Sequence, residues 1–151
     1  MLKNIVRKQY QAKFDQLKST IKISRPNEGW LRTLRKALGM TIPQLATRLN
    51  LSKAQVSQIE RMELEDRVSL KQLRRVADTM DCDLVYALVP RKALSELIQD
   101  RAHLKAANLV NKTNAQMTLE AQQLNEDALR EHIEAETERL IKEMPRNLWD
   151  D

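Results

Sequence analysis

Apolar positions between residues 30 and 61 recur with a helical period that is broken twice. Gly39 ends the first apolar series, since glycine commonly follows the last residue of a helix. Thr41 and Ser52 are good N-caps for a second and a third helix. The apolar residues that define the three helical series are Leu31, Leu34, Leu38, Leu45, Ala46, Leu49, Val56 and Ile59.

The third helix, expected at 52–61, has two unlike faces. Val56 and Ile59 point inward, while the outward positions carry short or polar side chains. A helix that packs on one side and touches base edges on the other needs this layout. The side chains predicted to contact bases are Lys53, Ala54, Gln55, Ser57 and Gln58. The alternative is an ordinary three-helix core with a polar surface.

The series Leu38-Gly39, Thr41, Leu45-Ala46, Leu49, Ser52, Val56-Ser57 and Ile59-Glu60-Arg61 resembles the Cro/C1-type (XRE) repressor family. The stretches GWLRTLRKALGMT, SLKQLRR and CDLVYALVPR are more closely similar to the "mobile mystery protein A" family. Members of that family are bacterial helix-turn-helix proteins, typically encoded beside a Fic-domain protein. The resemblance implies a lambda-repressor-like domain that binds double-stranded DNA.

The resemblance also implies a structural ion pair. An arginine on the first helix of the family pairs with the glutamate that ends the recognition helix, and the matching residues are Arg35 and Glu60. We expect this pair to be partly buried and to fix the helix angle. Arg61-Met62 stands where the family commonly turns at a glycine, so the resemblance does not define the chain after the third helix.

Residues 83–89 have another pattern, after a fourth helix capped by Ser69. Alternate residues point to opposite faces, and both faces are apolar, which predicts a strand buried on both sides. No second strand is predicted, so its partner would be the same strand of a second copy, antiparallel across a two-fold axis. The residues of this dimer strand are Leu84, Val85, Tyr86, Ala87, Leu88 and Val89. The competing interpretation is that they extend a helix.

The flanking segments are predicted to be helical. Residues 2–18 form an amphipathic helix within a basic segment at 1–25, which either lies on DNA or packs on its own domain. Beyond Pro90, residues 91–123 are helical with a break expected at 111–114, and a last helix follows the N-cap Asn125 and spans about 126–143. These helices could enlarge a dimer, bind a partner or cover the domain.

Charge and composition narrow the function. Residues 1–90 carry 17 Lys and Arg against 9 Asp and Glu, and residues 91–151 carry 9 against 12, so the basic charge lies with the helix-turn-helix. The single cysteine suits a reducing cytoplasm, and no apolar run is long enough to span a membrane. No constellation of a nucleophile, a base and an oxyanion donor is visible, and neither are metal-ligand or phosphate-loop motifs. We therefore expect no enzyme activity, no cofactor and no metal.

Together these features predict a mainly α protein in three parts: a basic arm at 1–25, a helix-turn-helix domain at 29–90 and a helical extension at 91–151. The predicted function is a sequence-specific transcriptional regulator, a cytoplasmic homodimeric repressor that binds a palindromic operator with half-sites roughly 34 Å apart. The residues expected to hold phosphates are Thr41, Arg32, Arg67, Lys71 and Arg74. The alternative, from the resemblance, is an antitoxin that neutralises a neighbouring Fic-domain toxin and represses their shared operon. A nucleic-acid coat protein is disfavoured by the specific helix-turn-helix spacing.

Overall fold

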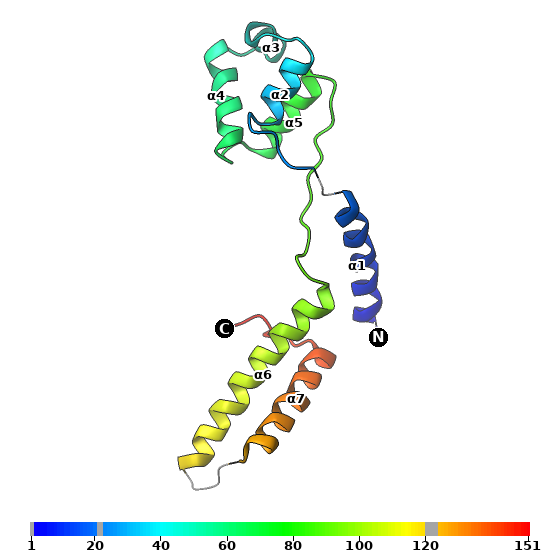
Figure 1. The fold of residues 1–151 in the computed structure, drawn as a ribbon, viewed down its shortest axis with the longest axis vertical. Coiled ribbons are helices and arrows are strands. Elements are labelled where there is room, and N and C mark those ends of the chain that lie inside the picture. Colours follow the sequence, from blue (N-terminus) through cyan, green and yellow to red (C-terminus); the bar gives the residue numbers. More distant parts are fainter. Residues whose placement is uncertain (1, 21–22, 120–123) are drawn as a thin grey trace. The chain divides into compact units, whose positions relative to one another are not determined.

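The chain folds as two compact helical units. The computed structural model describes residues 2–20, 23–119 and 124–151. One unit comprises residues 16–88, and the other comprises residues 1–15 together with 89–151. The regular structure of the described ranges is entirely helical (Figure 1), which confirms the mainly α fold class. None of these helices is both long enough and apolar enough to cross a membrane.

The unit at 16–88 holds four short helices. They are α2 (Trp30–Ala37), α3 (Ile42–Leu49), α4 (Lys53–Leu64) and α5 (Leu70–Thr79). The predicted N-caps Thr41, Ser52 and Ser69 are confirmed, because each hydroxyl accepts a hydrogen bond from the backbone amide three residues later. These caps fix where each helix starts and therefore which residues face inward.

A single apolar core holds these helices together. α3 packs against α4 and α5, and α2 packs against the same two helices. Because the inward positions of all four helices are aliphatic, they meet in one contiguous cluster. The buried members of that cluster are Leu31, Leu45, Ala46, Leu49, Val56, Ile59, Val76 and Met80.

α4 runs one turn further than the sequence predicted. The helix continues through Leu64, three residues beyond the expected end at Arg61. Met62 stands where a glycine would favour a left-handed turn, and methionine is a good helix former. The chain instead reverses at Asp66, whose φ is +55°. The longer helix brings Glu63 into contact with α2, a contact that the sequence prediction missed.

The strand predicted at 83–89 is wrong, and so is the alternative that these residues extend a helix. Residues 82–90 contain neither helix nor strand. A strand exists only where a neighbouring backbone supplies its hydrogen bonds, and the described chain places none beside this segment. The apolar side chains are left in solvent instead, with Val85 85% and Leu88 87% exposed.

The second unit is built on a helical hairpin. α6 (Leu94–Leu119) packs along α7 (Glu126–Glu143). The predicted last helix and its N-cap Asn125 are confirmed, since the Asn125 carboxamide accepts from the Ala128 amide at 2.8 Å. The buried apolar residues of this unit are Ala102, Ala106, Leu140 and Leu148. The two alanines on α6 permit the close approach of the larger leucines.

The break expected at 111–114 is wrong, because α6 is continuous there. Asparagine and threonine each disfavour a helix by less than about 1 kcal/mol, which tertiary packing can offset. The Thr113 hydroxyl also returns its hydrogen bond to the Leu109 carbonyl of the preceding turn, at 3.0 Å.

The first residues of α1 (Leu2–Thr20) belong to this second unit. The Gln11 side-chain oxygen accepts a 2.9 Å hydrogen bond from the Leu94 amide at the start of α6. Ile5 and Tyr10 are more than half exposed. The amphipathic helix predicted at 2–18 is therefore present, and part of its apolar side faces solvent.

Candidate nucleic-acid interface

The candidate interface begins at the turn between α3 and α4. α3 ends at Asn50, which has a left-handed backbone with φ +56°. The guanidinium of Arg75 on α5 donates to the Leu49 carbonyl at 2.6 Å, where the last carbonyls of a helix lack partners. The turn is thus held both by its own backbone geometry and by a side chain from another helix.

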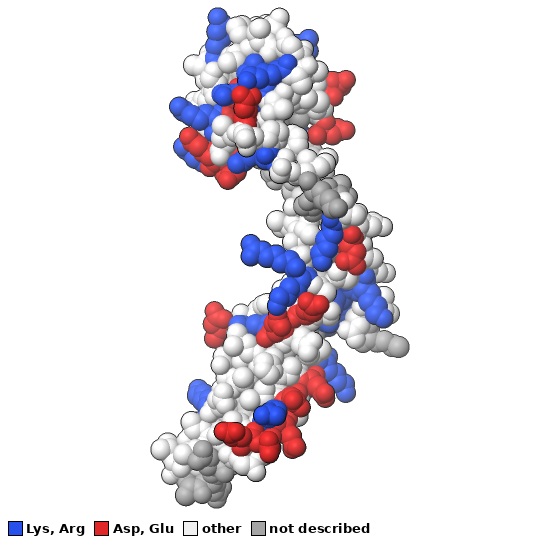
Figure 2. Space-filling model, viewed as in Figure 1, with Lys and Arg blue, Asp and Glu red and all other residues white. Residues whose placement is uncertain are grey.

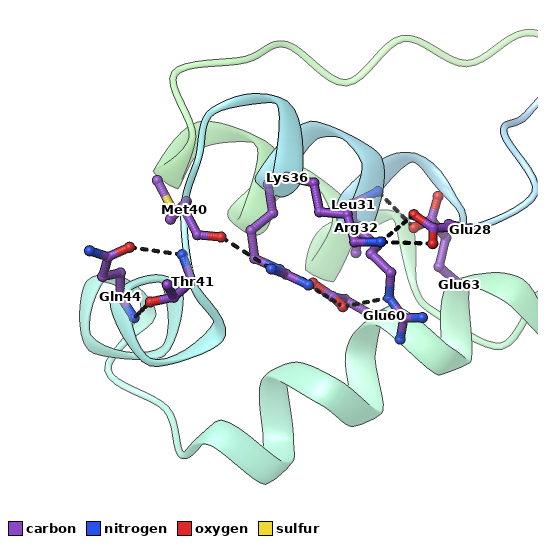
Figure 3. Close-up of polar contacts among 10 residues, drawn as sticks. Glu28, Leu31, Arg32, Lys36, Met40, Thr41, Gln44, Glu60 and Glu63 are labelled. Atoms are coloured by element: carbon purple, nitrogen blue, oxygen red, sulfur yellow. Dashed lines mark hydrogen bonds and ion pairs between the residues drawn. The ribbon is translucent and has the colours of Figure 1, made fainter.

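Both helices of the motif start with a reciprocal capping box. The amide of Thr41 donates to the Gln44 side chain at 2.8 Å, and the Gln44 amide donates to the Thr41 hydroxyl at 3.4 Å (Figure 3). At α4, the amide of Ser52 donates to the Gln55 side chain at 2.9 Å, and the Gln55 amide donates back at 3.1 Å. Both hydroxyl caps were predicted from the sequence, whereas the role of the two glutamines is visible only in the structure.

These boxes bear on two of the predicted contacts. Two amides in the first turn of α3 are already bonded inside the box, and Pro43 has no amide hydrogen. Fewer backbone donors are therefore available to a phosphate near Thr41 than the sequence prediction assumed. The side-chain oxygen of Gln55 is similarly occupied, so the donor for a base from this residue is its NH₂ group.

α4 has the two faces that its sequence indicates. Val56 is 1% exposed and Ile59 is 5% exposed, both within the core. The five side chains predicted to contact bases all lie on the exposed side of α4, and they are Lys53, Ala54, Gln55, Ser57 and Gln58. The structure therefore brings this predicted set together on one accessible helix face.

Glu60 is the centre of a buried ion cluster on the inner side of α4. Its carboxylate is 1% exposed and accepts from Arg35 Nε at 2.6 Å and Nη2 at 3.2 Å (Figure 3). Arg35 also donates to the Met40 carbonyl at 3.1 Å, which ties the end of α2 to the segment that leads into α3. Among the described residues, every buried side-chain nitrogen and oxygen has a hydrogen-bond partner. The expected pair of Arg35 and Glu60 is therefore formed and nearly dry.

The cluster shifts the titration of both partners. Burial by itself would raise the pKa of Glu60, but hydrogen bonds from Arg35 and Arg32 outweigh burial and hold that pKa below its ordinary value. The hydrogen bond to Glu60 raises the pKa of Arg35. Both groups are consequently charged at neutral pH, and the two hydrogen bonds from the Arg35 guanidinium to the Glu60 carboxylate depend on these charges.

The predicted phosphate contacts fall into two groups. Lys71 and Arg74 lie exposed on α5 and form no ion pair with any residue that the structure describes. Arg32 instead donates to Glu60 at 3.1 Å, and Arg67 donates to Glu65 at 2.9 Å. On the face shown in Figure 2, basic and acidic side chains are interspersed over this unit. The free cations of α5 are thus the stronger candidates for a phosphate backbone.

No cluster of metal ligands accompanies this interface. Within residues 2–20, 23–119 and 124–151, no group of three or more His, Cys, Asp and Glu side chains could hold a metal ion. The distinctive chemistry of the described unit at 16–88 is its polar helix face and its cations.

A helix-turn-helix family model of the XRE type matches residues 31–86. This is a DNA-binding regulatory family and not an enzyme family, and the match supports a DNA-binding transcriptional regulator. Neither a curated protein nor a solved structure matches the chain. The matched residues contain α3, α4 and α5 completely and all of α2 except Trp30.

Proposed function

We propose that this protein is a sequence-specific DNA-binding regulator that contacts bases through α4. One observation carries the proposal: α4 buries Val56 and Ile59 and presents five small or polar side chains from the opposite face. An α-helix is about 10–12 Å across, and the major groove is about 12 Å wide. The exposed face of α4 therefore has the size and the chemistry to enter that groove.

The side chains suggest a division of roles. Lys53 suits the O6 and N7 acceptors of guanine, Gln58 suits adenine, and the methyl group of Ala54 suits a thymine methyl. Lys71 and Arg74 suit phosphates, which fix the register of the protein on the duplex. Repression through an upstream operator is the regulatory outcome that we propose for such a protein.

The test begins by selecting a preferred duplex from a random pool with the wild-type chain. Lys53→Ala or Gln58→Ala should each relax the preference at one base pair, by about 1–3 kcal/mol. Arg74→Ala should weaken all sequences alike and lower the dependence of log K on log salt by about one. Lys112→Ala, an exposed cation on α6, removes the same charge elsewhere and is the matched control. Unchanged discrimination in both α4 variants would rule out base contacts through this face.

We further propose that two copies associate through the apolar segment at 84–89, so that two α4 helices meet a palindromic operator. The support is exposure: Val85, Tyr86 and Leu88 are 85%, 64% and 87% exposed. Contiguous apolar surface of this kind commonly marks a protein contact. No inter-chain sheet is needed for this proposal, since apolar packing alone can provide the contact.

Sedimentation equilibrium tests the association. Val85→Asp should raise the dimer dissociation constant at least about tenfold, because a charge would have to be desolvated at the contact. Leu119→Asp, at an apolar residue that is 89% exposed on α6, is the matched control and should have no effect. A wild-type chain that stays monomeric at every accessible concentration contradicts the proposal.

A second candidate function, neutralisation of a Fic-domain partner, comes from the family resemblance. One feature of α7 favours a protein contact there. Four carboxylates follow one side of α7 and pair with no cation in the described chain, namely Asp127, Glu131, Glu134 and Glu138. Figure 2 shows acidic side chains gathered along this unit. Co-purification with the product of the adjacent gene, lost on Glu131→Lys with Glu134→Lys and retained on Lys112→Ala, would establish the role.

A further inference from the structure

The C-terminal end of α4 is tied to the start of α2 by the side chain of Glu63. This carboxylate is buried, and it accepts from the Trp30 amide at 2.7 Å. It also accepts from the Leu31 amide at 2.9 Å (Figure 3). The first amides of a helix have no partner within it, and a negative charge is favourable at that end. Glu63 thus caps α2 from another helix.

Gly29 makes room for this contact. It is the N-cap residue of α2, supplies no side-chain cap and has φ +83°, a conformation that other residues rarely adopt. A Cβ at this position would lie 2.8 Å from Glu63 Oε2. A larger residue at position 29 would therefore be strained by this φ and would displace the Glu63 carboxylate.

Arg25 secures the same end of α4 from the other side. Its guanidinium donates to the Glu63 carbonyl at 3.0 Å and to the Asp66 carboxylate at 2.7 Å. The last carbonyls of a helix are unpaired acceptors and attract a cation. Because Asp66 is 81% exposed, this ion pair adds little stability, and its effect is to hold the helix end in place.

Glu60 and Glu63 give α4 two separate fixed points on α2. Glu60 binds Arg35 in the last turn of α2 and also Arg32, and Glu63 binds the backbone at the first turn. One contact would fix a distance between the helices and leave rotation about that point. Two contacts at opposite ends of α2 also fix the angle between the helices.

The geometry has a consequence for base contacts. Without Glu63, α4 would pivot about Glu60, and Lys53 lies seven residues from Glu60, a lever of about 10.5 Å at 1.5 Å per residue. A tilt of about 10° about Glu60 would move the Lys53 backbone by about 1.8 Å, which is enough to break a hydrogen bond of ordinary length. We propose that Glu63, supported by Gly29 and Arg25, is a positioning residue that sets the angle of α4 and thereby its discrimination between DNA sequences. This inference rests on the proposed function.

The experiment compares affinity for the duplex selected by the wild-type chain with affinity for a scrambled duplex of equal length, using the full chain. Glu63→Ala should reduce the ratio of the two affinities at least about tenfold, while the salt dependence on the scrambled duplex stays unchanged. A role in folding alone would weaken both duplexes equally. Glu65→Gln is the matched control, because Glu65 is the C-cap residue at the same end of α4 and its side chain is exposed. This variant should retain the wild-type ratio of affinities.

Glu63→Gln and Arg25→Lys approximately keep the size of each side chain, and they test the same inference if Glu63→Ala fails to fold. Glu63→Gln should lose discrimination, because it replaces a charged acceptor by a neutral one. Arg25→Lys should retain most of it, because a lysine can still reach the helix carbonyls. A folded Glu63 variant with the wild-type ratio overturns the inference and leaves the proposed function standing. A wild-type chain that discriminates no sequence refutes the proposed function and the inference with it.

Discussion

Removal of one partner from the buried pair of Arg35 and Glu60 should strongly destabilise the helix-turn-helix unit. Glu60→Ala leaves the Arg35 side chain, which is 9% exposed, without its carboxylate in a dry site. Breaking a buried pair from one side costs about 3–5 kcal/mol, since the remaining charge is uncompensated. For a unit of this size, that corresponds to a fall in melting temperature of about 12 °C or more.

Replacement of both partners should be far milder. In the Arg35→Met, Glu60→Leu double variant no charge is stranded, and the methionine and leucine fill a similar volume beside an aliphatic core. We expect a free energy of unfolding within about 1 kcal/mol of the wild type. Only the Met40 carbonyl loses a donor, and Arg32 can turn to solvent because its side chain is already 35% exposed.

Urea unfolding followed by tryptophan fluorescence measures both effects. Trp30 lies in the helix-turn-helix unit and Trp149 in the other unit, so a Trp149→Phe background reports on the first unit alone. A loss below about 1 kcal/mol for Glu60→Ala would show that the site is hydrated and refute the reasoning. A double variant as unstable as Glu60→Ala would show instead that the pair itself stabilises the fold.

Three further outcomes follow from the structure. The pKa of Glu60 is lowered in the folded chain, so its stabilisation is complete above the ordinary value of 4.5 and is lost as the pH falls through the folded value. In an acid titration the Arg35→Met, Glu60→Leu variant should lack this part of the loss, and an unchanged acid transition would contradict the assignment. Leu140→Ala should destabilise the hairpin unit by about 2–5 kcal/mol, seen in Trp149 fluorescence but not in the Trp30 signal, whereas a shift in both signals would mean that the units unfold together. Asn50→Gly should preserve or raise the melting temperature, while Asn50→Ala should cost about 1 kcal/mol because of its left-handed backbone; equal effects of the two would argue against that conformation in solution.

Helix starts were the most predictable part of the fold. Thr41, Ser52 and Asn125 act through hydrogen bonds to amides three residues away, so the information that defines each start is local in sequence. The inward residues of α3 and α4 followed from spacing for the same reason. The exposed face of α4, and with it the candidate base-contact set, could be assembled from these local signals alone.

The features that escaped prediction depend on distant parts of the chain. Glu63 and Gly29 are 34 positions apart, and only the folded unit shows that the carboxylate needs the space beside the glycine. The sequence nevertheless held a sign of this contact, because Met62 replaces the glycine that would end α4 early and Glu63 follows Glu60 by three residues.

Helical spacing also fails at helix ends. Leu38 and Leu70 match the spacing but lie 52% and 43% exposed at helix ends, where the period no longer defines a buried side.

The segment at 83–89 exposes a different limit of sequence reasoning. Alternating apolar residues predict strand conformation only if another backbone lies alongside, and that partner is not encoded within the segment. The sequence therefore indicated that the side chains of this segment form an apolar surface suited to a contact with another molecule. It did not define the backbone conformation that the segment adopts in the single chain.

The contacts of Arg25 and Gly29 with Glu63 place the start of the helix-turn-helix domain upstream of the residues that match the family. Both residues precede the stretch that matches the helix-turn-helix family, although they lie against the last turn of α4. A fragment trimmed to residues 31–86 would lack Arg25 and the Trp30 amide, so Glu63 would keep one of its two partners on α2 and the end of α4 would be held less firmly. A fragment prepared for DNA-binding measurements should accordingly start upstream of Ser24. Weak binding by a shorter fragment would result from the loss of these contacts and would not describe the intact protein.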